Sequence, residues 1–305
     1  MTDANTHDIV PDSERRGLIG ALPSPLRPYA LLMRLDRPIG AWLLFWPCAW
    51  SVALAGMGPN GARLIAWLAL GAWAMRSAGC VWNDMVDRDL DSRVERTRLR
   101  PLASGRASLA GAWVLLAALC VIGLAVLLQI GRTAQFAALA SLAPVAAYPF
   151  MKRITWWPQA WLGLVFSWGA LVGWPAVRGE LDPTPFILWA GSVFWVIGYD
   201  TIYALQDRED DALVGVKSSA LALGRHVRVG VAVCYTIALA LWAAALWRVR
   251  PDGLAFVALL PMAGHLAWQV FRLDPGDGGD ALAKFRSNRM AGFILFLACL
   301  VVGTS

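Results

Sequence analysis

The chain has 305 residues, of which 58% are hydrophobic and 16% are charged, and it contains 17 tryptophans. A chain with so few charges exposes most of its surface to lipid, so we predict a polytopic, all-α membrane protein that lies in a lipid bilayer. The net charge of +6 does not indicate a nucleic-acid partner, because the basic residues lie mainly in loops on one side of the predicted spans.

The N-terminal 25 residues are polar and have no apolar stretch behind their basic residues. We therefore predict that residues 1–25 are a flexible tail rather than a cleaved signal peptide, and that residues 26–305 form one transmembrane domain. Nine apolar segments in this domain have about the length that a helix needs to cross a bilayer. They are residues 39–56, 63–82, 108–128, 133–150, 158–177, 184–206, 226–247, 253–271 and 286–303.

Lys and Arg are distributed unevenly among the connecting segments. With the N-terminus inside, 21 of the 27 basic residues lie in inner segments, five lie in outer loops, and Arg76 lies within a helix. The positive-inside rule then predicts a cytoplasmic N-terminus.

Two arginines precede the first acidic stretch. Arg37 stands at the cytoplasmic end of the first apolar segment, where an arginine often marks the membrane interface. Arg76 lies inside the second segment, and an ionised group there costs about 2.5–3.5 kcal/mol on insertion scales. We therefore expect Arg76 to face the protein interior.

The first acidic stretch, residues 79–91, follows directly on the second apolar segment. If the helix continues through it, Asn83, Asp84, Asp87 and Asp91 share one face. Four such groups repel one another unless a cation lies among them, and hard oxygen ligands suit Mg²⁺ or Ca²⁺. The stretch therefore predicts a metal site.

Cations follow at the same predicted membrane face. Residues 92–106 form a basic loop, and Tyr148, Lys152 and Arg153 close the fourth apolar segment. A further loop carries Lys217. Beside a metal site these groups are suited to bind phosphate, arginine through two planar contacts and lysine as a point charge.

A second acidic stretch, residues 199–211, has the same character as the first. It places Asp200, Tyr203, Asp207 and Asp211 on one helical face, and a shift of 120 positions aligns its last two acids with those of the first stretch. The alternative is that both stretches are solvated helix ends. We favour a pair of metal-binding faces.

Two acidic faces, divalent metal ions, cationic loops and a hydrophobic interior are the parts needed to bind a lipid diphosphate. Metal ions would neutralise the diphosphate as a leaving group, and Arg and Lys would stabilise its departing charge. An allylic donor would leave a carbocation, which the rings of Tyr203, Trp82 or Trp168 could face.

These segments resemble the UbiA superfamily of intramembrane prenyltransferases, and most of all the bacterial 4-hydroxybenzoate polyprenyltransferases of ubiquinone biosynthesis. The resemblance runs from about residue 30 to residue 300. Its most specific segments are residues 37–40, 76–91, 96–97 with 100–105, 148–153 with Pro158 and Gln159, and 199–211 with 215–218. It implies nine transmembrane helices around a central cavity, cytoplasmic cap loops, and a location in the bacterial inner membrane.

The resemblance also implies an activity, the Mg²⁺-dependent transfer of a polyprenyl group from polyprenyl diphosphate to C3 of 4-hydroxybenzoate. It implies that the acidic faces bind Mg²⁺. It also implies that Asp200 orients or deprotonates the acceptor phenol, and that Tyr203 and Arg153 lie beside the reaction. The remaining basic side chains and the hydroxyl of Tyr148 would hold the substrates. The metal set is Asn83, Asp84, Asp87, Asp91, Asp207 and Asp211, and the substrate set is Arg37, Arg76, Tyr148, Lys152, Arg153 and Lys217.

Two alternatives stay open from the sequence. One is a member of the same superfamily with another acceptor, such as haem, a chlorophyllide or a naphthoate. The other is an ion-coupled transporter, because intramembrane acids paired with cations also mark ion pathways. A transporter would carry its charges near the midplane on broken helices, whereas here the acids cluster at one face.

Overall fold

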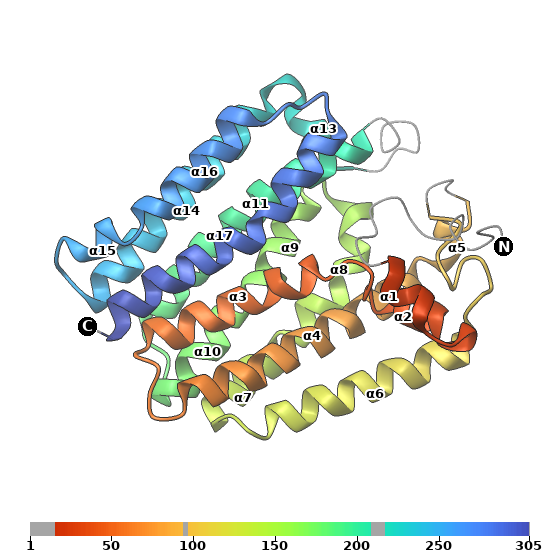
Figure 1. Cartoon of the computed structure of the whole chain (residues 1–305), viewed down its shortest axis with the longest axis horizontal. Coiled ribbons are helices and arrows are strands. Elements are labelled where there is room, and N and C mark those ends of the chain that lie inside the picture. Colours follow the sequence, from red (N-terminus) through yellow and green to blue (C-terminus); the bar gives the residue numbers. More distant parts are fainter. Residues whose placement is uncertain (1–15, 94–96, 209–216, 305) are drawn as a thin grey trace. The chain divides into compact units, whose positions relative to one another are not determined.

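The computed structural model describes residues 16–93, 97–208 and 217–304, and in this part of the chain every regular element is a helix (Figure 1). The elements are α1 (Arg16–Ala21), η1 (Ser24–Leu26), α2 (Arg27–Leu32), α3 (Ile39–Leu54), α4 (Gly61–Val86), α5 (Arg88–Asp91), α6 (Leu109–Leu127), α7 (Arg132–Ala140), α8 (Leu142–Ile154), α9 (Pro158–Ser167), α10 (Gly169–Arg178), α11 (Pro183–Tyr203), η2 (Ala204–Asp207), α13 (Ser219–Leu223), η3 (Gly224–His226), α14 (Val227–Val249), α15 (Leu254–Val257), α16 (Leu260–Arg272) and α17 (Gly278–Thr304). The predicted all-α class is confirmed.

Membrane spans account for most of these elements. Among the described residues, eight helical spans are long and apolar enough to cross a bilayer, and α3 is a shorter apolar helix of 16 residues with Pro47 inside it. Each of the nine predicted segments coincides with one of these spans. A multi-pass membrane protein is therefore the correct class.

Several spans consist of two helices rather than one. The predicted segment 133–150 is divided at Ser141 into α7 and α8. Pro144 has no N–H to donate to the carbonyl of Ala140, four residues earlier, so the helical hydrogen-bond pattern is interrupted at this point.

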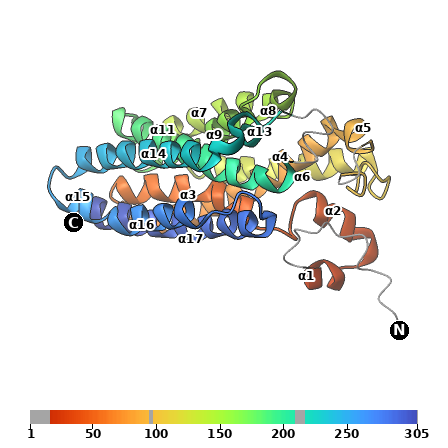
Figure 2. The ribbon, with the colours of Figure 1, turned by 90° about the horizontal axis from the view of Figure 1, so that it is seen from above.

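The chain forms two compact units, and the first consists of residues 1–41 and 70–126. Its short helices α1 and α2 pack together through Ile19, Ala30 and Leu31 (Figure 2). Within residues 1–25, for which the sequence predicts a flexible tail, residues 16–21 form the short helix α1. The buried side chain of Ile19 explains why this segment is folded.

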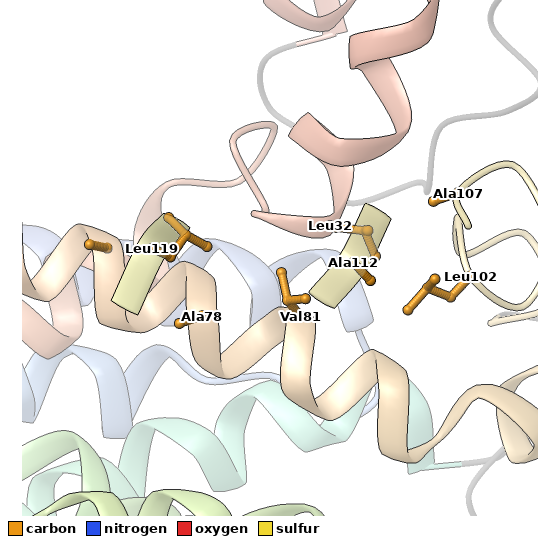
Figure 3. Close-up of a cluster of buried hydrophobic side chains, with 8 residues drawn as sticks. Leu32, Ala78, Val81, Leu102, Ala107, Ala112 and Leu119 are labelled. Atoms are coloured by element: carbon orange, nitrogen blue, oxygen red, sulfur yellow. The ribbon is translucent and has the colours of Figure 1, made fainter. Parts of the chain in front are cut away.

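The core of the first unit joins α2, α4, α6 and the loop between α5 and α6. Its side chains point toward one another in Figure 3, where Val81 of α4 lies close to Leu32 and Ala112. Leu102 and Ala107 bring the predicted basic loop into the same cluster. The loop is therefore anchored by apolar burial at its C-terminal half.

The second unit consists of residues 42–69 and 127–305 and is built around α11. The helices α9, α14 and α17 pack against α11 (Figure 1). Close approach requires glycine: a Cβ at Gly198 would lie 2.4 Å from the ring of Tyr235, and one at Gly191 would lie 2.8 Å from the ring of Trp242. The helix that carries the start of the second acidic stretch thus packs closely against α14.

Hydrogen bonds between helices pair several of the polar groups buried in this unit, away from water. The indole of Trp195 on α11 donates to Asn288 Oδ1 on α17 at 2.9 Å. The Tyr235 hydroxyl on α14 donates to Gln269 Oε1 on α16 at 2.6 Å. These bonds fix the rotation of α11, α14, α16 and α17 about their own axes.

Candidate functional site

The first acidic stretch remains nearly helical through its whole length. Asp87 lies between α4 and α5 with φ −92° and ψ 0°, but its N–H donates to the Asn83 carbonyl at 2.9 Å, and the N–H of Asp91 donates to the Asp87 carbonyl at 2.8 Å. The side chains of Asp84, Asp87 and Asp91 are buried, whereas Asp89 is exposed. The acids therefore share one buried face, as the sequence spacing predicts.

Two arginines bind this acidic face within the first unit. Arg34 Nη2 lies 2.7 Å from Asp84 Oδ1, and Arg100 Nη1 lies 3.2 Å from the same oxygen and 2.9 Å from Asp91 Oδ2. Arg100 thus bridges two carboxylates that are seven residues apart. The basic loop that carries Arg100 is held on the acidic face by these contacts as well as by its apolar residues.

Arg34 adopts a backbone conformation that residues other than glycine usually avoid. Its φ is +57°, in the left-handed region, and such a residue costs on the order of 1–3 kcal/mol. Its guanidinium donates to the Leu31 carbonyl at 3.1 Å as well as to Asp84. These contacts offset the strain and direct the side chain toward the acids.

Burial and neighbouring charges shift the pKa values of two groups at this face. Burial raises the pKa of Asp91, Arg100 lowers it, and Asp84 and Asp87 raise it again, so that the pKa lies above its usual value. Burial alone would lower the pKa of Arg34, but Asp84 and Asp36 raise it above its ordinary value. The neighbouring acids thus keep the guanidinium of Arg34 charged in spite of its burial.

A hard divalent cation fits the donors present here. Asp84 Oδ2 is a buried carboxylate oxygen without a hydrogen-bond partner, and carboxylate oxygens are the ligands that Mg²⁺ prefers. Across residues 16–93, 97–208 and 217–304, however, no three carboxylate, thiolate or imidazole groups are arranged as a metal site. Arg100 lies between Asp84 and Asp91, so cation binding there requires the guanidinium to move.

Asp36 is a further buried acid, which sequence reasoning did not single out. Its side chain is fully buried, Oδ2 accepts a hydrogen bond from Arg37 Nε at 3.1 Å, and Oδ1 has no partner. An acid next to the arginine at a helix mouth was the available signal. Asp36 orients the Arg37 guanidinium.

Arg76 lies against the backbone of α3 at Gly40. A Cβ at Gly40 would be 2.5 Å from Arg76 Nε and 2.9 Å from Nη2. The predicted substrate-binding arginine is thus directed inward, as expected from its cost in lipid, and the absence of a side chain at residue 40 makes room for it.

The second acidic stretch departs from the predicted single α-helical face. The helix α11 ends at Tyr203, and the next four residues form the 3₁₀ helix η2, which includes Asp207. Because a 3₁₀ helix turns by about 120° per residue rather than 100°, the expected face is rotated after Tyr203. Asp211 and the side chain of Asp207 lie outside the described residues.

Aromatic rings line the described part of this stretch. Asp200 is half-buried. The ring of Tyr203 lies 4.5 Å from that of Phe285 on α17, and Phe285 also contacts Tyr199 at 5.7 Å between ring centroids. Phe285 was missed from the sequence, because only the packing of α17 on α11 brings it here.

Two other aromatic candidates serve as packing residues in the structure. Trp82 lies 6.4 Å from Trp113 of α6, and Trp168 lies 6.2 Å from Trp189 of α11. The Trp168 indole donates to the Ala137 carbonyl at 2.8 Å. Trp82 belongs to the first acidic stretch and Tyr203 to the second.

The predicted cations of the second unit lie in two places. Lys217 Nζ lies 5.5 Å from the centre of the Trp156 ring. Tyr148 is half-buried on α8. Lys152 and Arg153 belong to the last turn of α8, and their side chains lie outside the described part of the chain.

Known proteins resemble this chain in sequence and in fold. The UbiA prenyltransferase family matches residues 44–300. The protein named 4-hydroxybenzoate polyprenyltransferase, mitochondrial, of Drosophila melanogaster is 45% identical over 287 residues, which cover 93% of this chain and 73% of that protein. The protein of the same name from Caenorhabditis elegans is 44% identical over 283 residues, covering 92% and 79%.

Solved structures agree with this result. The apo structure of a UbiA homologue from Aeropyrum pernix K1 has a TM-score of 0.71 and 26% identity, covering 85% of this chain and 97% of that one. A UbiA homologue from Archaeoglobus fulgidus, solved with GPP and Mg²⁺, has a TM-score of 0.65 and 19% identity, covering 91% and 100%; it has the same fold. The buried acidic face, the arginines on it and these matches lead to one conclusion, that the chain belongs to the UbiA prenyltransferase family.

Proposed function

We propose that the protein transfers a polyprenyl group from polyprenyl diphosphate to C3 of 4-hydroxybenzoate, a Mg²⁺-dependent membrane step of ubiquinone biosynthesis. The observation that carries the proposal is the buried face of Asp84, Asp87 and Asp91, which has an unpartnered carboxylate oxygen and two bound arginines. Relatives at 42–45% identity are named for this activity.

In the first unit, Asn83, Asp84, Asp87 and Asp91 would hold the metal ion of the donor diphosphate. When bound, Mg²⁺ neutralises the diphosphate and favours cleavage of the C–O bond. The homologue of the same fold that was solved with GPP and Mg²⁺ supports this assignment. Arg37 and Arg76 bind the phosphate oxygens and stabilise the charge that develops on the leaving group.

In the second unit, Asp207 and Asp211 have the corresponding role toward metal and diphosphate. Tyr148, Lys152, Arg153 and Lys217 bind the donor diphosphate or the acceptor carboxylate. These four assignments follow the sequence resemblance. The side chain of Lys217 lies beside the ring of Trp156.

Asp200 and Tyr203 act on the organic part of the reaction. The C1–O bond of the donor breaks, the bonding electrons leave with the diphosphate, and C3 of the acceptor forms the new C–C bond. The ring then loses its C3 proton. Asp200 accepts the hydrogen bond of the acceptor phenol and makes the ring more nucleophilic, while the ring of Tyr203 faces the allylic cation.

We also propose the inner membrane of a bacterium as the location, with a cytoplasmic N-terminus, which follows from the distribution of Lys and Arg. The relatives named above are mitochondrial proteins. The proposed chemistry is the same in either location.

Product analysis with purified protein tests the proposal. Geranyl diphosphate, 4-hydroxybenzoate and Mg²⁺ are expected to yield a 3-geranyl-4-hydroxybenzoate, and EDTA is expected to abolish the product until Mg²⁺ is restored. A dihydroxynaphthoate is the matched acceptor control. Preferential transfer to the naphthoate would overturn the acceptor assignment, and full activity in EDTA would overturn the metal assignment.

A further inference from the structure

Residues 217–219 are held by directional hydrogen bonds within the second unit. The backbone N–H of Ser219 donates to Gln159 Oε1 at 3.1 Å, and the Ser219 hydroxyl lies 2.7 Å from the Thr201 hydroxyl. Gln159, Thr201 and Ser219 are 5%, 1% and 0% exposed. Two helices, α9 and α11, thus bind Ser219, the first residue of α13 (Ser219–Leu223).

The proton positions in this cluster follow from the number of donors. The Thr201 hydroxyl lies 2.6 Å from the Ile197 carbonyl, which can only accept. Because a hydroxyl has one hydrogen, Thr201 donates to Ile197 and accepts from Ser219. Loss of the Thr201 hydroxyl would therefore leave the buried Ser219 hydroxyl without this acceptor, and such a loss is costly away from water.

A second contact holds the side chain of Lys217, two residues before Ser219. Its ammonium lies 5.5 Å from the centre of the Trp156 ring, within the range of a cation–π interaction. Trp156 lies in the connection between α8 and α9, three residues before Gln159 of α9. The start of α9 and the connection before it therefore contact both the backbone after Lys217 and the charge of Lys217 itself.

Thr201 connects this cluster to the acidic stretch of α11, because it follows Asp200 directly and precedes Tyr203 by two residues. Hydrogen bonds are directional, so they set the position of the Lys217 segment along α11 more narrowly than apolar packing does. We propose that Gln159, Thr201 and Ser219 are positioning residues that fix Lys217 for binding the donor diphosphate. The inference rests on the proposed function, since it takes Lys217 as a phosphate-binding group.

A pair of variants at Thr201 provides the first test. Thr201→Val keeps the shape and removes the hydroxyl, whereas Thr201→Ser keeps the hydroxyl and is the matched control. We expect Thr201→Val to raise KM for geranyl diphosphate about tenfold, the order of effect of one charge-assisted hydrogen bond. KM for 4-hydroxybenzoate stays at the wild-type value, and Thr201→Ser behaves as the wild type.

A double-mutant cycle with Lys217→Ala separates positioning from general stability. If the hydroxyl acts through Lys217, Thr201→Val has no further effect on donor KM in the Lys217→Ala background. Additive effects, an equal rise of both KM values, or an unchanged donor KM would each overturn the inference. If Thr201→Val does not fold, Gln159→Met removes the other bond and replaces it in the same cycle.

Calorimetry with geranyl diphosphate and Mg²⁺ measures donor binding without any acceptor, so it tests this inference independently of the proposed function. A wild-type protein that binds the donor but does not prenylate 4-hydroxybenzoate contradicts the proposed acceptor only. In that case the calorimetric affinities of the same variants decide the role of the cluster, with the same tenfold loss expected for Thr201→Val.

Discussion

Substitution of Gly40 by alanine tests the position of Arg76 without removing any charged group. The added Cβ would lie 2.5 Å from Arg76 Nε, 2.9 Å from Nη2 and 3.1 Å from Cζ. Because non-bonded heavy atoms are in favourable contact at about 3.5–4.0 Å, the Arg76 guanidinium has to move about 1 Å away from the new Cβ. The guanidinium is the mobile end of a long side chain, so it can move by rotation about its own bonds.

The expected result is a loss of activity with little loss of stability. Gly40 is the second residue of α3, and the preference of helices for alanine over glycine, at most about 1 kcal/mol, offsets part of the cost of the shifted side chain. A displacement of about 1 Å in a positioned group can lower turnover by about 10²-fold. We therefore expect kcat to fall by about two orders of magnitude while the unfolding temperature in detergent changes little.

Prenyl transfer and thermal unfolding are measured for Gly40→Ala beside Gly264→Ala, since a Cβ at Gly264 of α16 would meet no atom within 4 Å. The control is expected to keep wild-type activity. In an Arg76→Ala background, Gly40→Ala should have no additional effect. Full activity of Gly40→Ala, or an equal further loss in that background, would refute the reasoning.

Three further predictions follow from the site. Asp84→Asn should lower the free energy of unfolding by about 3–5 kcal/mol, because breaking a buried ion pair leaves a charge unpaired; unchanged stability on chemical unfolding, together with lost activity, would make Asp84 a metal ligand only. Asp200→Asn should retain affinity for geranyl diphosphate and lose about 10²–10⁴-fold in transfer, whereas Asp91→Asn should lose donor affinity; equal loss of affinity in both would place Asp200 in the metal site. Cysteines introduced at Ser104 and Gly179 should be labelled from the cytoplasmic and the outer side, respectively, and labelling of residue 104 from outside would contradict the proposed topology.

The membrane spans were predictable because lipid imposes one dominant constraint on the sequence. A helix must bury about 20 apolar residues to cross a bilayer, and this length is visible in the sequence. The acidic stretch of residues 83–91 was predictable for a related reason, since a spacing of three and four residues defines one face of a helix. The side chains of Asp84, Asp87 and Asp91 on that face are buried in the structure.

The partners of these acids were not predictable from their spacing. Arg34 lies 50 positions before Asp84, and their contact depends on a left-handed backbone at Arg34 that no sequence pattern near it requires. The cluster of Gln159, Thr201 and Ser219 likewise joins three segments distant in the sequence. Helical periodicity identifies which residues share a face, but the packing of helices decides what that face meets.

The short first span has a consequence for how it is covered in the membrane. With 16 residues, α3 is about 24 Å long at 1.5 Å per residue, about 6 Å less than a typical hydrocarbon core. The side chains of residues 45–55 are buried, and the helix lies so close to Gly173 and Gly303 that a Cβ at either position would meet its backbone. Neighbouring helices rather than lipids therefore cover the difference in length, and activity in reconstituted membranes should change little with the acyl-chain length of the lipids.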